Sequence, residues 1–296
     1  MEKIIHENEN NKKETIIIID QNSKYYPKQL RDIHRPPKQL YCIGNIDLLT
    51  KKLVAVVGSR KVSTYGRWVA ETLSRHLSVH DAVVVSGLAE GVDTYAHVGA
   101  LEGGGNTIAV LGTGIDKCYP MDNRWLKNKI KKEGLVVSEF PPGYPTQRYN
   151  FPMRNRIIAG LCQWLFVAEA GLDSGSLITA NFSNDYGREV YAVPGNINSQ
   201  YNLGSNKLLC EGAMPVYSIS DAVQIVTKKE IEKTEISDLG SDERRIYNFL
   251  YNGSEKSIDE ISRALDVPIG QVNALVTILE IKGYVYNSLG KVFVAK

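Results

Sequence analysis

The sequence predicts a doubly wound α/β domain with a mostly parallel sheet, followed by a small C-terminal winged-helix domain. Six short runs rich in Val, Ile, Leu and Ala end in Gly or a polar residue, and helical stretches lie between most of them. Apolar runs without polar alternation indicate strands covered on both faces. Strands that alternate with helices indicate right-handed crossovers between parallel neighbours. Near the C-terminus, three helical segments precede a short strand pair, a pattern typical of a winged helix.

The first domain is predicted to span residues 51–226. Its expected strands are 53–59, 82–87, 107–112, 135–140, 164–170 and 189–195. Examples of the helical stretches between them are 64–77, 91–104 and 174–187. Each run is six or seven residues long and rich in β-branched side chains, which favours strands over short buried helices.

The residues before this domain have a different composition. Residues 1–14 are rich in Asn, Lys and Glu, so we expect them to be disordered. Residues 15–50 contain a short apolar strand at 16–19 and then Pro27, Pro36 and Pro37, which predict an extended, irregular segment. Residues 1–50 are therefore expected to form an N-terminal tail and an extended segment that leads into the sheet.

The last quarter of the chain follows a charged and polar stretch, 227–240, which we interpret as a linker. Residues 241–296 then contain the three helical segments and a wing at about 284–287 and 291–294. Ser257 and Glu260 have the spacing of a capping box, and Pro268 fits the start of the third helix. These signals predict a folded winged helix.

Composition limits the functions that the chain can have. The formal net charge is only +2, so a nucleic-acid site has to be a local patch. The four cysteines are isolated, which favours buried free thiols over a metal site or a disulfide framework. No signal peptide and no membrane-spanning run is found, so we expect a cytoplasmic protein without membrane contact. The sequence indicates no metal and no organic cofactor.

Ligands of a doubly wound sheet bind outside the carboxyl ends of its strands, so these positions give the candidate site. The first strand is followed by Gly58, Ser59, Arg60 and Lys61, where a tight turn leads to a helix start and a bidentate cation. Lys117 and Arg124 follow the third strand. An ordinary strand-to-helix turn with an exposed arginine explains the first of these segments equally well.

Two later segments add candidates of different chemistry. Phe151, Arg154, Asn155 and Arg156 begin a helix, where cations suit phosphates and an aromatic ring suits base stacking. The alternative is that Asn155 and one arginine fix loops within the protein. Ser174, Gly175 and Ser176 stand at another helix start, as anion ligands or as a simple cap. No Walker lysine loop, zinc motif or serine nucleophile elbow is present, so no catalytic residue is predicted.

Seven segments in order resemble the DNA-processing protein A family, also called DprA or Smf. They are GSRKVSTYGR, SGLAEGVDTYAHVGAL, VLGTGIDKCYP, SEFPPG, FPMRNRIIAGL, VAEAGLDSGSLITA and VYAVPGNI. The resemblance covers about residues 25–226. It implies an extended Rossmann-like domain that binds single-stranded DNA, protects incoming DNA during natural transformation and loads the RecA recombinase.

The resemblance also implies roles for particular residues. Arg60 is expected to contact a DNA phosphate, and Arg154, Asn155 and Arg156 to line the same pocket. Ser174, Gly175 and Ser176 match the helix-start motif of the family. Relatives form homodimers through the late part of the domain. That part matches GSNKLLCEGA here and assigns Leu208 and Leu209 to the dimer contact.

The chain departs from the family pattern in two respects, and two alternative functions are considered. Many relatives carry an N-terminal helical SAM-like domain, for which residues 1–24 are too short. The winged helix has seven basic and seven acidic residues over 242–296, so a partner protein fits it at least as well as duplex DNA. One alternative function is a nucleotide-processing Rossmann enzyme of the lysine-decarboxylase-like group. The other is a winged-helix transcription regulator.

Overall fold

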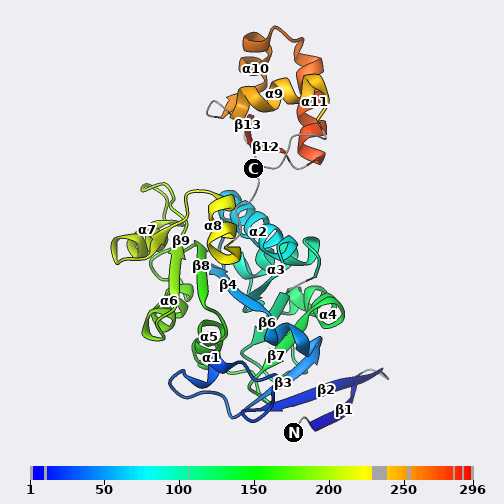
Figure 1. The fold of residues 1–296 in the computed structure, drawn as a ribbon, viewed down its shortest axis with the longest axis vertical. Helices are drawn as coiled ribbons and strands as arrows, with labels where there is room; N and C mark the ends of the chain where they lie inside the picture. Colours follow the sequence, from blue (N-terminus) through cyan, green and yellow to red (C-terminus); the bar gives the residue numbers. More distant parts are fainter. Residues whose placement is uncertain are drawn as a thin grey trace. The chain divides into compact units, whose positions relative to one another are not determined.

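The computed structural model describes residues 3–9, 12–105, 107–228, 239–251, 255–282, 284–288 and 290–294. The chain divides into two compact units, Met1–Lys229 and Glu230–Lys296 (Figure 1). Each unit has its own hydrophobic core.

A ten-stranded sheet forms the centre of the first unit. Its spatial order is β1-β2-β3-β7-β6-β5-β4-β8-β9-β10. Neighbours from β7 to β10 are parallel, whereas β1, β2 and β3 join antiparallel. The bounds are β1 Lys3–Glu9, β2 Lys12–Asp20, β3 Gln39–Gly44, β4 Lys52–Gly58, β5 Ala82–Ser86, β6 Thr107–Leu111, β7 Leu135–Ser138, β8 Trp164–Glu169, β9 Glu189–Ala192 and β10 Met214–Pro215. The predicted α/β class and mostly parallel sheet are confirmed.

Helices cover both faces of this sheet (Figure 1). One face carries α2 Thr64–Val79, α3 Val92–Glu102, α4 Arg124–Glu133 and α8 Ile219–Thr227. The other carries α1 Lys28–Arg31, α5 Asn150–Leu161, α6 Ser176–Asp185 and α7 Leu203–Cys210. Two short 3-10 turns, η1 Ile46–Thr50 and η2 Met121–Asn123, complete the described elements of this unit.

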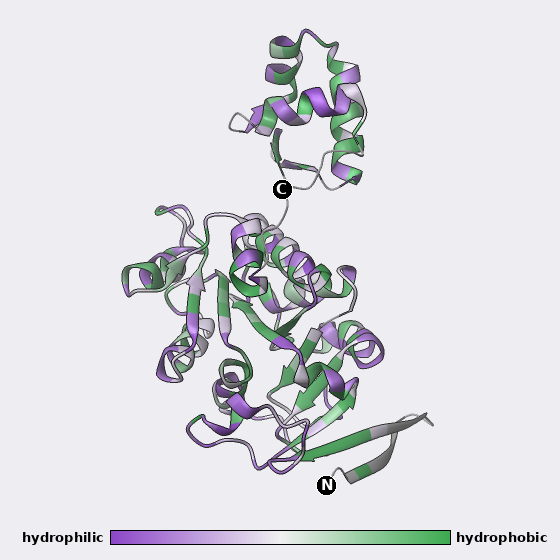
Figure 2. Ribbon diagram, viewed as in Figure 1, coloured by the Kyte–Doolittle hydropathy of each residue, from purple (hydrophilic) through white to green (hydrophobic). Residues whose placement is uncertain are grey.

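The central strands are apolar because both of their faces are covered. Every residue of β5, β6 and β8 is buried. Figure 2 shows the central part of the sheet as mainly hydrophobic. On β4, Leu53, Ala55 and Val57 face one helix layer. Burial on both faces is the reason why these runs lack the alternation of a half-exposed strand.

The strand order reverses between β4 and β8. From β4 the chain builds outward through β5, β6 and β7, and then returns to place β8 on the other side of β4. Loops at the carboxyl ends of β4 and β8 therefore diverge to opposite faces of the sheet and leave a crevice between them. This topological switch point is where the fold provides room for a ligand.

The predicted tail and irregular segment need correction. The described residues of 1–14 form strands, because β1 pairs with β2 in an antiparallel hairpin, from Lys3 opposite Ile18 to Glu9 opposite Lys12. Ile16–Ile19 lies in β2 as expected, and β2 and β3 extend the main sheet. Pairing with a neighbouring strand supplies hydrogen bonds that the local composition does not reveal.

The second unit has the helices and wing that the sequence predicts. Its elements are α9 Ser241–Tyr251, β11 Lys256–Ser257, α10 Ile258–Leu265, α11 Ile269–Ile281, β12 Val285–Ser288 and β13 Lys291–Val294. The capping box of Ser257 and Glu260 is present, and Pro268 immediately precedes α11. A short third strand, β11, which the sequence did not suggest, pairs with β13.

The four cysteines have free thiols, but they differ in exposure. Cys42 and Cys162 are buried, whereas Cys118 is half-buried and Cys210 is exposed.

In the part of the chain that the structure describes, no single helix is long and apolar enough to cross a bilayer. Helices α10 and α11 reach that length and composition only as a pair bent by 114°.

Helices α2 and α3 pack unusually closely at Gly99. A Cβ atom at this position would overlap the backbone carbonyl oxygen of Glu71 in α2. Backbone atoms of a packed helix cannot move aside as the tip of a flexible side chain can. The spacing of the two helices on this face of the sheet therefore depends on a residue without a side chain.

We predict that Gly99→Val lowers the free energy of unfolding by about 3 kcal/mol, because it overpacks the α2–α3 contact. Urea unfolding of the full chain, followed by circular dichroism, measures this loss. The matched control is Glu102→Val, which introduces the same side chain at an exposed position of the same helix. An equal effect of both substitutions would contradict the packing argument.

His97 of α3 is fully buried. The Thr107 hydroxyl donates to the Val84 carbonyl at 2.9 Å, so it accepts from His97 Nδ1 at 2.7 Å. His97 Nε2 has no hydrogen-bond partner among the described atoms. Burial, with a contribution from Arg154, lowers the pKa of His97 to about 3, so the ring is neutral.

Stability is expected to fall as the pH drops below about 6.5, where a histidine in the unfolded chain becomes protonated. The folded protein keeps His97 neutral down to about pH 3, so the unfolded state gains protons first. At about 1.4 kcal/mol per pH unit, the loss between pH 7 and pH 5 is about 2 kcal/mol. His97→Asn, which retains a donor toward Thr107, should flatten this pH dependence in denaturant unfolding. An unchanged slope would exclude His97 as its source.

Candidate nucleic-acid interface

A pocket of about 780 Å³ opens at the switch point between β4 and β8. Its walls come from the loops that follow both strands, from the first turns of α5 and α6, and from the loop before α7. Ten of the thirteen residues that the sequence predicted as DNA contacts line it: Gly58, Ser59, Arg60, Lys61, Phe151, Arg154, Asn155, Ser174, Gly175 and Ser176. The strand-end argument therefore located the pocket.

The loop after β4 is fixed by hydrogen bonds to its neighbours. Ser59 Oγ accepts from the Gly171 amide at 3.1 Å, and the Ser59 amide donates to the Glu169 carbonyl at 2.8 Å. Gly58 lies so close to Val92 and to the Glu169 carbonyl that a Cβ atom would approach Val92 Cγ2 to 2.5 Å. Gly58 and Ser59 therefore shape the wall, and Ser59 uses its hydroxyl within the protein.

Glu169, at the end of β8, anchors the same loop from below and is fully buried. Its carboxylate accepts from the Ser63 amide at 2.7 Å and from the Ser63 hydroxyl at 2.5 Å. Ser63 in turn caps α2, because its Oγ accepts from the Gly66 amide at 3.0 Å. This buried carboxylate orders the segment that carries Arg60 and Lys61.

Arg154 forms part of the pocket floor and is only 5% exposed. Its guanidinium donates to the carbonyl oxygens of Gly87 and Val110, which follow or end neighbouring strands, and to Asn155 Oδ1 at 3.1 Å. Burial lowers the pKa of Arg154 to about 10, although Asp93 opposes this shift. The side chain stays charged at neutral pH and ties the ends of β5 and β6 to α5.

Asp93 fixes the loop after β5 from the opposite side. Its carboxylate accepts from the Gly87 amide at 3.1 Å and from the Ala89 amide at 3.4 Å. Burial raises its pKa, and Arg154 counteracts this effect. Gly87 is needed here because a Cβ atom would lie 2.6 Å from the Arg154 guanidinium. The interior of the site is a hydrogen-bonded frame with paired charges.

The groups left available for a ligand stand at the rim. Arg60 and Lys61 are exposed, and the Arg60 guanidinium lies 6.0 Å from the centroid of the Phe151 ring. The Phe151 ring is 5.2 Å from that of Tyr119, which is 50% exposed. Cations beside accessible aromatic rings suit phosphates and unstacked bases together.

The helix start of α6 forms the facing wall. Ser174 Oγ and Ser176 Oγ lie 2.8 Å apart, and the Ser176 amide donates weakly to Ser174 Oγ at 3.4 Å. Asn155 Nδ2 donates to the Gly175 carbonyl at 3.2 Å, which connects α5 to this turn. Asn155 thus fixes a loop within the protein, which is the alternative role that the sequence left open for it.

Three predicted contact residues lie outside the pocket. Arg156 is two residues after Arg154, so the helix turns it to another side, where it forms an ion pair of 2.6 Å with Glu139. The expectation that it shares a pocket with Arg154 was wrong. Lys117 donates to the Gly143 carbonyl at 3.1 Å, and Arg124 is exposed at the start of α4. Neither belongs to the residues that line the pocket.

The residues assigned to a dimer contact have different environments. The side chain of Leu208 is 5% exposed and packs in the core beneath α7. Leu209 is partly buried against the same core. Leu208 is therefore committed to the fold of its own chain, and a dimer contact at Leu209 stays a prediction.

Sequence reasoning missed the wall formed by the loop after β9. Gln200, Tyr201 and Leu203 line the pocket, as do Leu172 and Asp173 in the loop after β8. Applying the strand-end argument to β9 would have indicated the first three. The local sequence does not indicate that the buried Glu169 organises the site, because its partner Ser63 is 106 residues away in the sequence.

Comparisons with known proteins identify the family. Residues 16–227 match the family profile of DNA recombination-mediator protein A. The chain belongs to this family. Residues 232–290 match the DprA winged helix domain, so the C-terminal unit of this family member is a winged helix as predicted.

Individual relatives agree with this family assignment. The chain is 46% identical to DNA processing protein DprA of Streptococcus pneumoniae over 198 residues, 67% of this chain and 70% of that protein. It is 37% identical to DprA of Bacillus subtilis over 215 residues, 72% of each. A solved structure of the Streptococcus pneumoniae protein aligns with a TM-score of 0.67 at 45% identity, over 70% of this chain and 72% of that one.

A second solved structure is that of DNA processing protein A from Helicobacter pylori, described for its unique single-stranded DNA binding mode. It aligns with a TM-score of 0.65 at 30% identity. The alignment covers 71% of this chain and 96% of that chain.

Arg154→Met should destabilise this family member by about 3 kcal/mol or more, because it leaves the Gly87 and Val110 carbonyls without a donor and Asp93 without a nearby cation. Thermal and denaturant unfolding measure the loss. Arg124→Met is the matched control, since Arg124 is exposed and outside the pocket. If both variants unfolded like the parent protein, the structural role of Arg154 would be excluded.

Proposed function

We propose that this member of the DNA recombination-mediator protein A family binds single-stranded DNA in the pocket at the β4–β8 switch point. The observation that carries the proposal is the joint presence of exposed Arg60 and Lys61 with the rings of Phe151 and Tyr119 at one rim. Bases of a single strand are free to stack on such rings, whereas those of a duplex are not. The single-strand binding of the Helicobacter pylori relative supports the same assignment.

Arg60 has the central role in this proposal. Its guanidinium presents several donors to a phosphate, and the neighbouring Phe151 ring orients it through a cation–π contact. Arg154 supports the site from the floor through its loop contacts. Stacking and phosphate contacts tolerate any base, so we expect little sequence preference.

The protein is proposed to act without catalysing a reaction. Of the two carboxylates that line the described part of the pocket, Asp93 accepts hydrogen bonds from the protein itself, and Asp173 is exposed to solvent. Ser174 and Ser176 face each other, and no histidine lines this pocket as the structure describes it. A nucleotide-processing enzyme of the lysine-decarboxylase-like group would cleave nucleoside monophosphates. Turnover of nucleoside monophosphates in a hydrolysis assay would therefore overturn this part of the proposal.

The wider role follows from the resemblance. We expect the protein to act in the cytoplasm as a homodimer, to protect incoming single strands and to load RecA on them during recombination or natural transformation. The winged helix is proposed to contact a partner protein. Two of its basic side chains form ion pairs within the unit, Lys282 with Glu243 and Lys291 with Glu255. A duplex would need such side chains for its phosphates. A transcription regulator would instead bind duplex DNA through this unit.

Arg60→Ala is predicted to weaken binding of oligo-dT at least tenfold, because the phosphate contact of Arg60 and its cation–π contact with the Phe151 ring are lost. Fluorescence anisotropy at several salt concentrations measures the affinity. The slope of log K against log salt should fall by about 0.7, the contribution of one phosphate contact on a single strand. Lys132→Ala, which removes an equal charge from an exposed position of α4, is the control.

The same titration with a matched duplex tests the alternative. Duplex preference that disappears when residues 241–296 are removed would make the protein a winged-helix regulator. Single-strand preference that survives this truncation and is lost in Arg60→Ala supports the proposal.

A further inference from the structure

A second pocket, of about 480 Å³, lies on the other side of α5 from the first. Its walls come from the segment before β3, from α5 and from α6. Its volume lies within the range of about 300–1,000 Å³ that is usual for small-molecule sites. Nothing in the function proposed above uses it.

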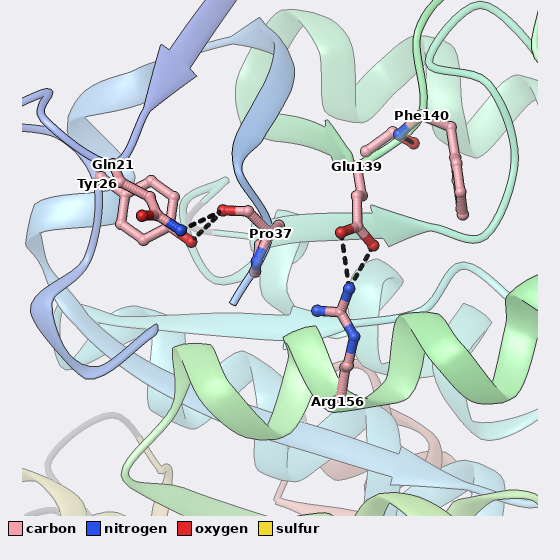
Figure 3. Close-up of polar contacts among 7 residues, drawn as sticks. Gln21, Tyr26, Pro37, Glu139, Phe140 and Arg156 are labelled. Carbon is pink, nitrogen blue, oxygen red and sulfur yellow. Dashed lines mark hydrogen bonds and ion pairs between the residues drawn. The ribbon is translucent and has the colours of Figure 1, made fainter. Parts of the chain in front are cut away.

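The feature that marks this pocket is the buried guanidinium of Arg156. The residue is 5% exposed, and both oxygens of Glu139 accept from a single nitrogen, Nη2, at 2.7 and 2.6 Å. In Figure 3 this nitrogen meets Glu139 while the other terminal nitrogen points away from it. Nε and Nη1 are buried and have no acceptor among the described atoms. Such donors are rarely left without a partner, so they indicate an absent acceptor.

The wall opposite Arg156 is fixed in place. Tyr26 donates its hydroxyl to the Pro37 carbonyl at 2.7 Å, and Gln21 donates to the same oxygen at 3.3 Å (Figure 3). Ile33 is 3% exposed and packs near Gly160 of α5. These contacts hold the segment that carries Asp32 and Arg35 against the helices, so the pocket is preformed.

The remaining lining suits a nucleobase. The rings of Phe182 and Tyr186 in α6 are stacked at 6.0 Å and 16°, and both are half-buried. Asp32 and Asp185 line the same pocket as Arg156 and supply acceptors. The Watson–Crick edge of every base carries both an acceptor and a donor, and a single strand leaves this edge free, so this combination accommodates any of the four. The two carboxylates make a bare phosphate a poor occupant, while exposed Arg35 at the rim can meet a phosphate of the backbone.

The two pockets are close enough for one strand. Pro152 and Asn155 line the first pocket, and the residues that follow them, Met153 and Arg156, line the second. On α6 the corresponding step runs from Thr179 to Phe182. Met153 is 37% exposed, so an apolar side chain lies where the strand would cross.

We propose that this second pocket holds one nucleobase of the single strand that occupies the first pocket, stacked beside Phe182 and hydrogen-bonded to Arg156. The inference rests on the single-strand binding proposed above. It extends the interface across α5 and α6 and predicts that strands long enough to reach both pockets bind more tightly than those that fill one.

The test is a length series of oligo-dT, from about 4 to 16 nucleotides, titrated by anisotropy against the full chain. The variants are Phe182→Leu, which removes the ring but keeps an apolar side chain, and Arg35→Asn. Arg35 has a φ of 58°, and Asn tolerates this left-handed backbone. We expect long strands to lose about tenfold in affinity, as loss of one stacking contact implies, and the shortest strands to be unaffected.

A second readout is 2-aminopurine placed singly along the long strand. One position should be quenched on binding to the parent protein and should recover in Phe182→Leu. Phe249→Leu, the same exchange at a half-buried ring of the other unit, is the control and should change neither readout.

The outcomes separate the two proposals. Loss at every length in Arg60→Ala, with no effect of Phe182→Leu or Arg35→Asn at any length, overturns the second pocket and leaves the first. No loss in Arg60→Ala overturns the proposed function itself. Equal loss on short and long strands in Phe182→Leu also overturns the second pocket, because it would indicate damage to the first.

Discussion

The buried guanidinium of Arg154 is the interaction on which the binding site depends. It bonds to carbonyl oxygens that follow β5 and end β6, reaches Asn155 beside it, and lies near the buried Asp93. A cation in this position is stable only because carbonyl dipoles and a carboxylate replace the water that it loses. Since several strand ends meet this one side chain, the pocket floor forms together with the sheet.

Around this floor, the residues divide into those that build the site and those that remain free. The polar side-chain atoms of Ser59 and Asn155 form hydrogen bonds with neighbouring loops. Arg60, Phe151 and Tyr119 keep accessible surfaces at the rim. This division explains how a chain with a formal net charge of +2 can still offer the nucleic-acid site proposed here. A few exposed cations on a rigid frame provide local attraction that the whole molecule lacks.

The fold was largely predictable, because the six apolar runs are covered on both faces and leave an unambiguous pattern. The pocket was predictable to the level of strand ends, because Arg60 and Ser174 follow two of the strands and both line it. The direction of each side chain was not. Arg154 and Arg156 are equivalent in the sequence, yet a helical turn sends one to the first pocket and the other to Glu139. The β1–β2 hairpin was missed because strand pairing depends on a distant partner and not on the local composition of 1–14.

The two edges of the large sheet differ in a way that affects the chain outside its binding role. One edge ends with β10, a strand of two residues, which offers little template for another strand. The other ends with β1, seven residues long and paired with β2 along one side. The sequence of β1, KIIHENE, carries charges of both signs, and charged edge strands resist pairing between molecules. Replacing these charged residues with apolar ones would therefore favour aggregation through this edge, an effect that is independent of ligand binding.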